Sequence, residues 1–187
     1  MATLVLTVIG DDQTGLVNAL AKVVSDGGGN WEGSHLAELA GKFAGIVVVT
    51  VADERAEELT AALRPLAGML EIAVHAGQEG RAGGGPVRTG TSGAAGASEE
   101  GGSTVSLELI GNDRPGIVRE ISGVFAQHGL SIAELATATR EAPMAGGRLF
   151  EARLRAPLPA GADLDAVRAD LERLADEILV DIAVATD

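Results

Sequence analysis

The sequence contains no cysteine and no tyrosine, and only one tryptophan and three phenylalanines among 187 residues. Without cysteine the chain has no disulfide framework, no thiolate metal site and no cysteine nucleophile. Basic residues are also scarce, since 14 Lys and Arg face 27 Asp and Glu, which makes the formal net charge −13. A chain this acidic is repelled by phosphate backbones, so we expect no direct binding to nucleic acid.

Long apolar runs are absent as well. No stretch approaches the roughly 18 apolar residues that cross a bilayer, and the first residues lack the basic and apolar regions of a signal peptide. We therefore expect a cytoplasmic protein without membrane contact. Apolar residues still make up 46% of the chain, which is enough for a core built from Val, Leu, Ile and Ala.

Residues 77–103 form a segment unlike the rest of the chain. It holds ten glycines and a single large aliphatic residue, Val87. Such a segment buries too little apolar surface to offset its ordering entropy, so we interpret it as a disordered, flexible linker. A phosphate-binding loop is the functional alternative, but that motif needs a preceding strand and a following helix. The linker interpretation predicts two domains, 1–76 and 104–187.

The two predicted domains repeat each other. Residues 3–32 align without a gap to residues 104–133 at a constant offset of 101, and an internal repeat of this kind indicates duplicated units. The repeated positions include glycine, aspartate and apolar residues: Gly10/Gly111, Asp12/Asp113, Gly15/Gly116, Val17/Val118 and Gly28/Gly129.

Hydrophobic periodicity predicts the same six elements in each unit. A strand, a one-sided apolar helix, two strands, a second helix and a final strand follow one another, which is the α+β, ferredoxin-like β-α-β-β-α-β arrangement. We place the second strands at 30–39 and 131–140 and the third strands at 45–52 and 149–156. The run from Ile46 to Val51 is apolar on both faces of its strand, which predicts sheet-to-sheet contact with the other unit or with another chain.

The turn before the first helix of each unit contains residues that are typical of a small-ligand site. A helix start carries unpaired N–H groups and a partial positive charge, which together favour an anion. Gly15 and Gly116 leave that backbone open to a ligand, and we expect Asp12 and Asp113 to cap the two helices. Taken alone, the pattern also fits an ordinary well-capped helix with no ligand.

The residues of this turn resemble a known family. Asn112-Asp113-Arg114-Pro115-Gly116-Ile117-Val118 is similar to the signature turn of ACT domains, and residues 11–17 carry a looser form of it. Residues 30–37, Asn-Trp-Glu-Gly-Ser-His-Leu-Ala, resemble the second strand of tandem ACT proteins related to the glycine cleavage system transcriptional repressor. The resemblance covers both units and implies two tandem ACT domains that bind small ligands, usually amino acids, at interfaces between units.

In that family the ligand lies between the turn of one unit and the start of the second strand of its neighbour. The resemblance implies that helix N–H groups hold the ligand's α-carboxylate, while an Asn amide or Asp carboxylate takes its α-ammonium. Ser131 replaces Asn30 in the second unit, so we expect the two sites to differ. The implied ligand-binding residues are Asp11, Asp12, Gly15, Leu16 and Asn30 in unit one, and Asn112, Asp113, Gly116, Ile117 and Ser131 in unit two.

Other conspicuous residues favour no catalytic or metal chemistry. The three histidines are not spaced as metal ligands are. We interpret the acidic residues of the second helices as the solvent-exposed faces of those helices. We interpret Trp31 as an anchor of the core or of an interface, in preference to a side chain that lines a ligand pocket. The arginines of unit two (Arg119, Arg148, Arg153 and Arg155) are expected to pair with acids of unit two itself or of a partner.

These observations lead to the hypothesis of a non-catalytic regulator without metal or cofactor. It senses a small amino acid, with glycine or serine favoured by the resemblance, and modulates a protein partner such as a transcription factor of amino-acid metabolism. The alternative is a detached regulatory subunit that associates with a metabolic enzyme. A homo-oligomer is expected in either case.

Overall fold

The computed structural model describes residues 1–77, 103–141, 147–159, 161–178 and 180–186. The segment interpreted as a linker therefore lies almost wholly outside the described residues. Unit one contains β1 (Ala2–Asp11), α1 (Leu16–Asp26), β2 (Asn30–Leu39), β3 (Lys42–Val51), η1 (Asp53–Arg55), α2 (Ala56–Leu63), η2 (Arg64–Gly68) and β4 (Leu70–Ala76). Unit two contains β5 (Thr104–Asn112), α3 (Ile117–Gln127), β6 (Glu134–Glu141), β7 (Arg148–Pro157), α4 (Leu164–Ile178) and β8 (Val180–Thr186).

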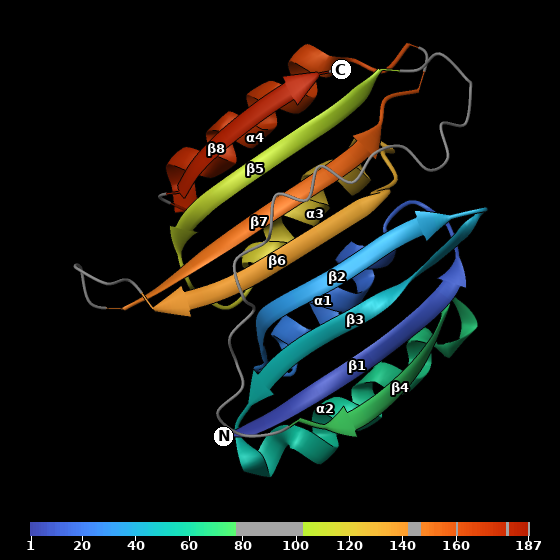
Figure 1. Ribbon diagram of the computed structural model, residues 1–187, viewed down its shortest axis with the longest axis vertical. Coiled ribbons are helices and arrows are strands. Elements are labelled where there is room, and N and C mark those ends of the chain that lie inside the picture. Colours follow the sequence, from blue (N-terminus) through green and yellow to red (C-terminus); the bar gives the residue numbers. More distant parts are fainter. Residues whose placement is uncertain (78–102, 142–146, 160, 179, 187) are drawn as a thin grey trace.

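The strands of both units form one antiparallel sheet in the order β4-β1-β3-β2-β6-β7-β5-β8 (Figure 1). Each unit contributes four neighbouring strands, and β2 pairs with β6 at the junction, from Gly33 opposite Ala138 to Ala37 opposite Glu134. The predicted β-α-β-β-α-β order is confirmed in both units. The two units lie edge to edge within a single chain.

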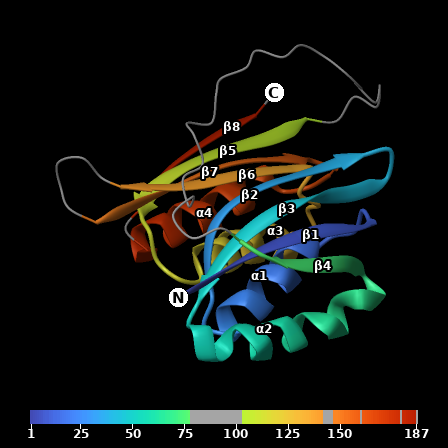
Figure 2. The ribbon, with the colours of Figure 1, turned by 60° about the horizontal axis from the view of Figure 1, so that its bottom comes forward.

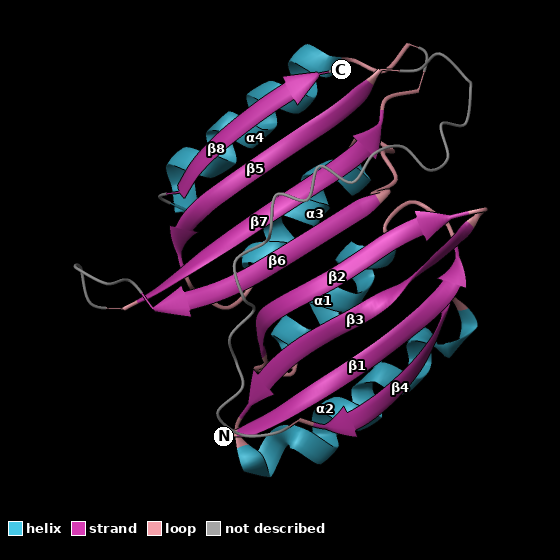
Figure 3. Ribbon diagram, viewed as in Figure 1, coloured by secondary structure: helices cyan, strands magenta, loops and turns pink. Residues whose placement is uncertain are grey.

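The helices α1, α2, α3 and α4 cover the same face of this sheet (Figures 2 and 3). The helices α1 and α3 lie at the centre and pack against each other. Each turns its apolar side to the sheet, as the periodicity predicts. The buried residues are Leu16, Val17, Leu20, Ala21 and Val24 in α1 and Ile117, Val118, Ile121, Ser122, Val124 and Phe125 in α3. No helix in the described part of the chain is long and apolar enough to cross a membrane.

The junction between the units is anchored by Trp31. Its side chain is 5% exposed, and its indole Nε1–H donates to Thr137 Oγ1 on β6 over 3.2 Å. The same Thr137 hydroxyl lies 2.9 Å from Ser34 Oγ. Trp31 is therefore an interface anchor between the units, as the sequence predicts.

The structure corrects three sequence predictions. The second strand of unit two begins at Glu134 instead of residue 131, and the third strand of unit one begins at Lys42 instead of residue 45. For the Ile46–Val51 strand, the predicted face-to-face contact with the second unit is wrong, because the units join through the edges of β2 and β6; its contact with another chain stays a prediction. Ile46 accordingly remains 49% exposed on the helix-free face of the sheet.

Candidate ligand-binding site between the two units

The turns that precede α1 and α3 have the same backbone geometry. Gly15 has φ 89° and Gly116 has φ 90°, a left-handed conformation that glycine adopts without the steric cost of a Cβ. Each glycine is the residue from which its helix begins. A Cβ built on Gly15 would meet no atom within 4 Å, and one on Gly116 would meet only Ser25 Oγ, at 3.5 Å. The backbone at both helix starts is therefore open.

Neither aspartate of these turns caps its own helix, so that prediction is wrong. Each carboxylate instead reaches across to the other unit. The Asn30 Nδ2–H donates to Asp113 Oδ2 over 3.0 Å, and Ser131 Oγ–H donates to Asp12 Oδ1 over 3.0 Å. The two contacts occupy equivalent places in the repeat, and each joins a turn of one unit to a residue four positions after the end of the first helix of the other.

The sequence-predicted site residues thus divide into groups. Asn30 lies with Asp113, and Ser131 lies with Asp12, while the glycines and the first helical residues Leu16 and Ile117 form the adjoining helix starts. Asp11 and Asn112 are not brought to either contact. Asp11 is exposed and pairs with Lys42 on the neighbouring strand, and Asn112 is exposed at the end of β5.

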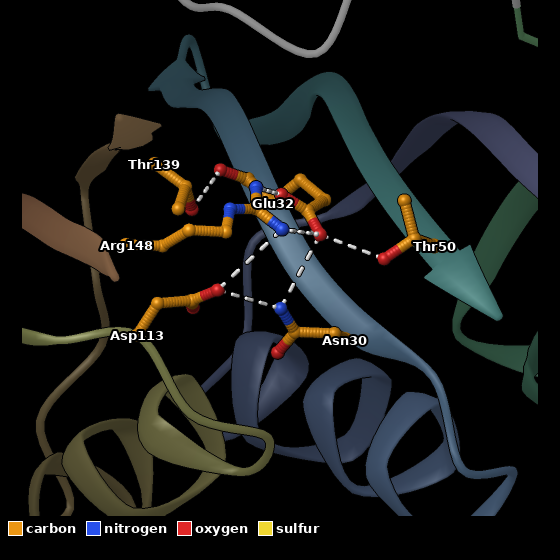
Figure 4. Close-up of polar contacts among 6 residues, drawn as sticks. All are labelled: Asn30, Glu32, Thr50, Asp113, Thr139 and Arg148. Atoms are coloured by element: carbon orange, nitrogen blue, oxygen red, sulfur yellow. Dashed lines mark hydrogen bonds and ion pairs between the residues drawn. The ribbon is translucent and has the colours of Figure 1, made fainter. Parts of the chain in front are cut away.

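The contact between Asn30 and Asp113 belongs to a larger polar group that sequence reasoning missed. We call this group the interface cluster (Figure 4). Its members come from both units: Asn30, Glu32, Thr50, Asp113, Thr139 and Arg148.

Glu32 is the most buried charge in the interface cluster, with its side chain 4% exposed. The Arg148 guanidinium binds it in bidentate fashion: Nη1 lies 2.9 Å from Oε1, and Nη2 donates to Oε2. Thr50 Oγ1–H donates to Oε1 over 2.7 Å, and Asn30 Nδ2 lies 3.3 Å from the same oxygen. The buried carboxylate is therefore fully partnered, as a buried charge requires.

A β-bulge places Glu32 at this position. Trp31 pairs with Val49 and Gly33 pairs with the adjacent Val48, so Glu32 is the extra residue of β2. The Thr139 hydroxyl on β6 donates to the Glu32 carbonyl oxygen over 2.7 Å. Bulges redirect side chains in this way, and the only signal in the sequence is the glycine that follows Glu32.

Asp113 has the least satisfied side chain of the interface cluster. The side chain is 7% exposed, and its Oδ1 is buried without a hydrogen-bond partner in the described structure. Burial raises the pKa of Asp113, and the hydrogen bond from Asn30 opposes that rise. Arg148 Nη1 lies 3.7 Å from Oδ2. A buried carboxylate oxygen without a donor favours a hydrogen-bonding cation at this point.

The equivalent place around Asp12 and Ser131 lacks these charges. Ala133 stands where the repeat has Glu32. The Asp12 N–H donates to the Gly41 carbonyl over 3.0 Å, just as the Asp113 N–H donates to the Arg148 carbonyl over 2.8 Å. Gly41 therefore takes the place of Arg148. A cavity of about 10 Å³ adjoins Asp12, which has room for about one water molecule.

Two family models for the ACT domain match the chain, over residues 2–77 and over residues 105–176. Among curated proteins, no sequence matches. Similar solved structures include a protein of unknown function from Galdieria sulphuraria, with 27% identity and a TM-score of 0.44, covering 100% of this chain and 98% of that one.

A provisionally assigned glycine cleavage system transcriptional repressor has 16% identity and a TM-score of 0.41, with 100% of this chain and 97% of that chain covered. Aspartate kinase from Synechocystis has 14% identity and a TM-score of 0.56 over 94% of this chain, but only 26% of the kinase is covered. The two family matches, one on each unit, show that the chain belongs to the ACT-domain family as a tandem pair.

Proposed function

We propose that the protein is a non-catalytic regulator that binds a small amino acid at the interface cluster and passes the effect to a protein partner. The observation that carries this proposal is Asp113 Oδ1, a buried carboxylate oxygen without a donor, in the turn directly before α3. A bound ammonium group would supply that donor.

The remaining groups suit the other end of an amino acid. The first turn of α3 presents backbone N–H groups and the positive end of the helix dipole, which favour a carboxylate. Gly116 has no side chain to hinder its approach, and the Asn30 amide lies beside Asp113 on the opposite unit. Glycine and serine lead the candidate ligands because of the resemblance carried by residues 30–37. We expect micromolar to millimolar affinity for so small a ligand.

Both units contribute to the interface cluster, and this supports a regulatory role. A ligand that contacts Asp113 of one unit and Asn30 of the other stabilises one relative arrangement of the units. A partner that prefers the same arrangement binds more tightly when ligand is present, and the coupling is reciprocal. The partner we favour is a transcription factor in the cytoplasm, with no direct contact between this acidic chain and nucleic acid. The alternative partner is a metabolic enzyme to which this chain serves as a separate regulatory subunit.

Thermal unfolding in the presence of each amino acid in turn tests the proposal. A ligand that binds only the folded state raises the melting temperature in a concentration-dependent way. We expect such a rise with glycine or serine, and no rise in the variant Asp113→Ala. If no amino acid raises the melting temperature at millimolar concentration, the proposal is wrong. Co-purification with the ligand present then separates a transcription factor from an enzyme as partner.

A further inference from the structure

The interface cluster carries an uneven set of charges. Its two carboxylates, on Glu32 and Asp113, face one guanidinium, on Arg148. The bidentate contact commits the guanidinium to Glu32, whereas the distance from Arg148 Nη1 to Asp113 Oδ2 is 3.7 Å. The formal charge of the cluster is therefore −1, and Asp113 is the carboxylate with the longer contact to the guanidinium.

Arg148 also occupies the solvent side of the cluster. Its side chain is 42% exposed, while Glu32 and Asp113 are 4% and 7% exposed. In Figure 4 the guanidinium lies across Glu32, with Asp113 and Asn30 beneath it. A ligand that reaches Asp113 therefore meets a guanidinium whose Nη1 and Nη2 already bind Glu32 and whose positive charge that carboxylate neutralises.

We infer that Glu32 and Arg148 determine the charge class of the ligand: by neutralising each other they leave Asp113 to select an ammonium group, and they exclude amino acids with an acidic side chain. This inference rests on the proposed function and adds two residues to its site. The equivalent place around Asp12 has Ala133 and Gly41, so the same selection is not built there.

Removing one charge at a time tests the inference. Glu32→Gln frees the guanidinium and changes the formal charge of the cluster from −1 to 0. The double variant Glu32→Gln/Arg148→Gln restores −1 without either original charge. If the two side chains act by packing alone, the preference for neutral amino acids over aspartate should change in the double variant at least as much as in Glu32→Gln. Charge selection predicts instead that the double variant regains the preference of the parent.

The measurement is competition binding of glycine, serine and aspartate to the full chain, with folding of each variant checked by circular dichroism. The parent should prefer the neutral amino acids at least about tenfold over aspartate. Glu32→Gln should bring that ratio close to one, and the double variant should restore it. Should Glu32→Gln fail to fold, Glu32→Ala makes the same change of formal charge with a smaller side chain, and it must lose the preference for neutral amino acids in the same way.

The possible results are distinct. An unchanged ratio in Glu32→Gln, or equal binding of aspartate and glycine by the parent, overturns the inference and leaves the proposed function standing. Absence of binding by every amino acid, in a parent protein shown to be folded, overturns the proposed function and the inference with it.

Discussion

Asn30 and Asp113 are 83 residues apart and belong to different units, yet the Asn30 amide donates to the Asp113 carboxylate over 3.0 Å. Neither unit alone contains both groups. The equivalent contact of the repeat, between Ser131 and Asp12, has the same length but none of the buried charge around it. For this reason we assign the contact between Asn30 and Asp113 to the candidate ligand site, and we assign a structural role to the contact between Ser131 and Asp12.

Asp113→Asn should alter how stability depends on pH. Burial raises the pKa of Asp113 in the folded state, so the folded protein holds this proton more tightly than the unfolded chain does. The contribution of Asp113 to the free energy of unfolding therefore falls as pH rises through that raised pKa. In thermal unfolding of both proteins from about pH 4 to about pH 7, the stability of the variant should increase relative to that of the parent as pH rises. A constant difference across this range would contradict the account.

Arg148→Ala should destabilise the junction of the units by removing the partner of a buried charge. Breaking a buried ion pair from one side costs about 3 kcal/mol or more, because the remaining charge is left unpaired. Adding Glu32→Gln to the same protein should recover much of the loss in a urea titration. The control is Arg153→Ala, whose ion pair with Glu108 is exposed and should cost about 1 kcal/mol or less. Equal losses for the two arginines would argue against a special role for Arg148.

Trp31→Ala should cost about 3–5 kcal/mol in the free energy of unfolding, because a large buried side chain leaves a cavity at the junction. Trp31→Phe should cost much less, since the ring still fills space and the Thr137 hydroxyl keeps its contact with Ser34. Urea unfolding followed by circular dichroism measures both. A cost below about 1 kcal/mol for Trp31→Ala would contradict the role of Trp31 as an anchor.

Gly15→Ala and Gly116→Ala should each cost about 1–2 kcal/mol, because alanine at φ near 90° is strained. The two glycines have the same backbone geometry, but we expect their substitutions to differ in their effect on amino-acid binding. Only Gly116 adjoins the interface cluster, so only its substitution by a larger residue should weaken amino-acid binding. Urea unfolding and calorimetric titration measure the two effects separately. Equal loss of binding in both variants would indicate two working sites.

The order of elements was predictable because the repeat aligns without gaps through the first strand, the turn and the first helix. The way in which the units join was not. The apolar run from Ile46 to Val51 indicated contact between sheet faces, yet the junction lies at the edges of β2 and β6. Alternation within a strand tells which side chains share a face, but it does not tell which sheet edge finds a partner.

The site was predictable only in part, for a related reason. Asn30, Asp12, Asp113 and Ser131 lie in the gapless part of the repeat, where the family resemblance places them. Glu32 lies in the interface cluster because it is itself the extra residue of the β-bulge in β2, which the repeat does not predict. Arg148 begins β7, and the connection between the second and third strands is longer in unit two than in unit one. The constant offset of 101 therefore no longer holds at Arg148, and the repeat does not predict its position.

Calorimetric titration of glycine and serine into the parent protein and into Asp113→Asn and Asp12→Asn tests the central claim most directly. Each variant keeps the size of its side chain and removes one carboxylate. The account predicts saturable heat with the parent, similar binding by Asp12→Asn, and loss of binding in Asp113→Asn while that variant stays folded. Binding that survives in Asp113→Asn, or that disappears only in Asp12→Asn, would contradict the assignment of the ligand site to the interface cluster.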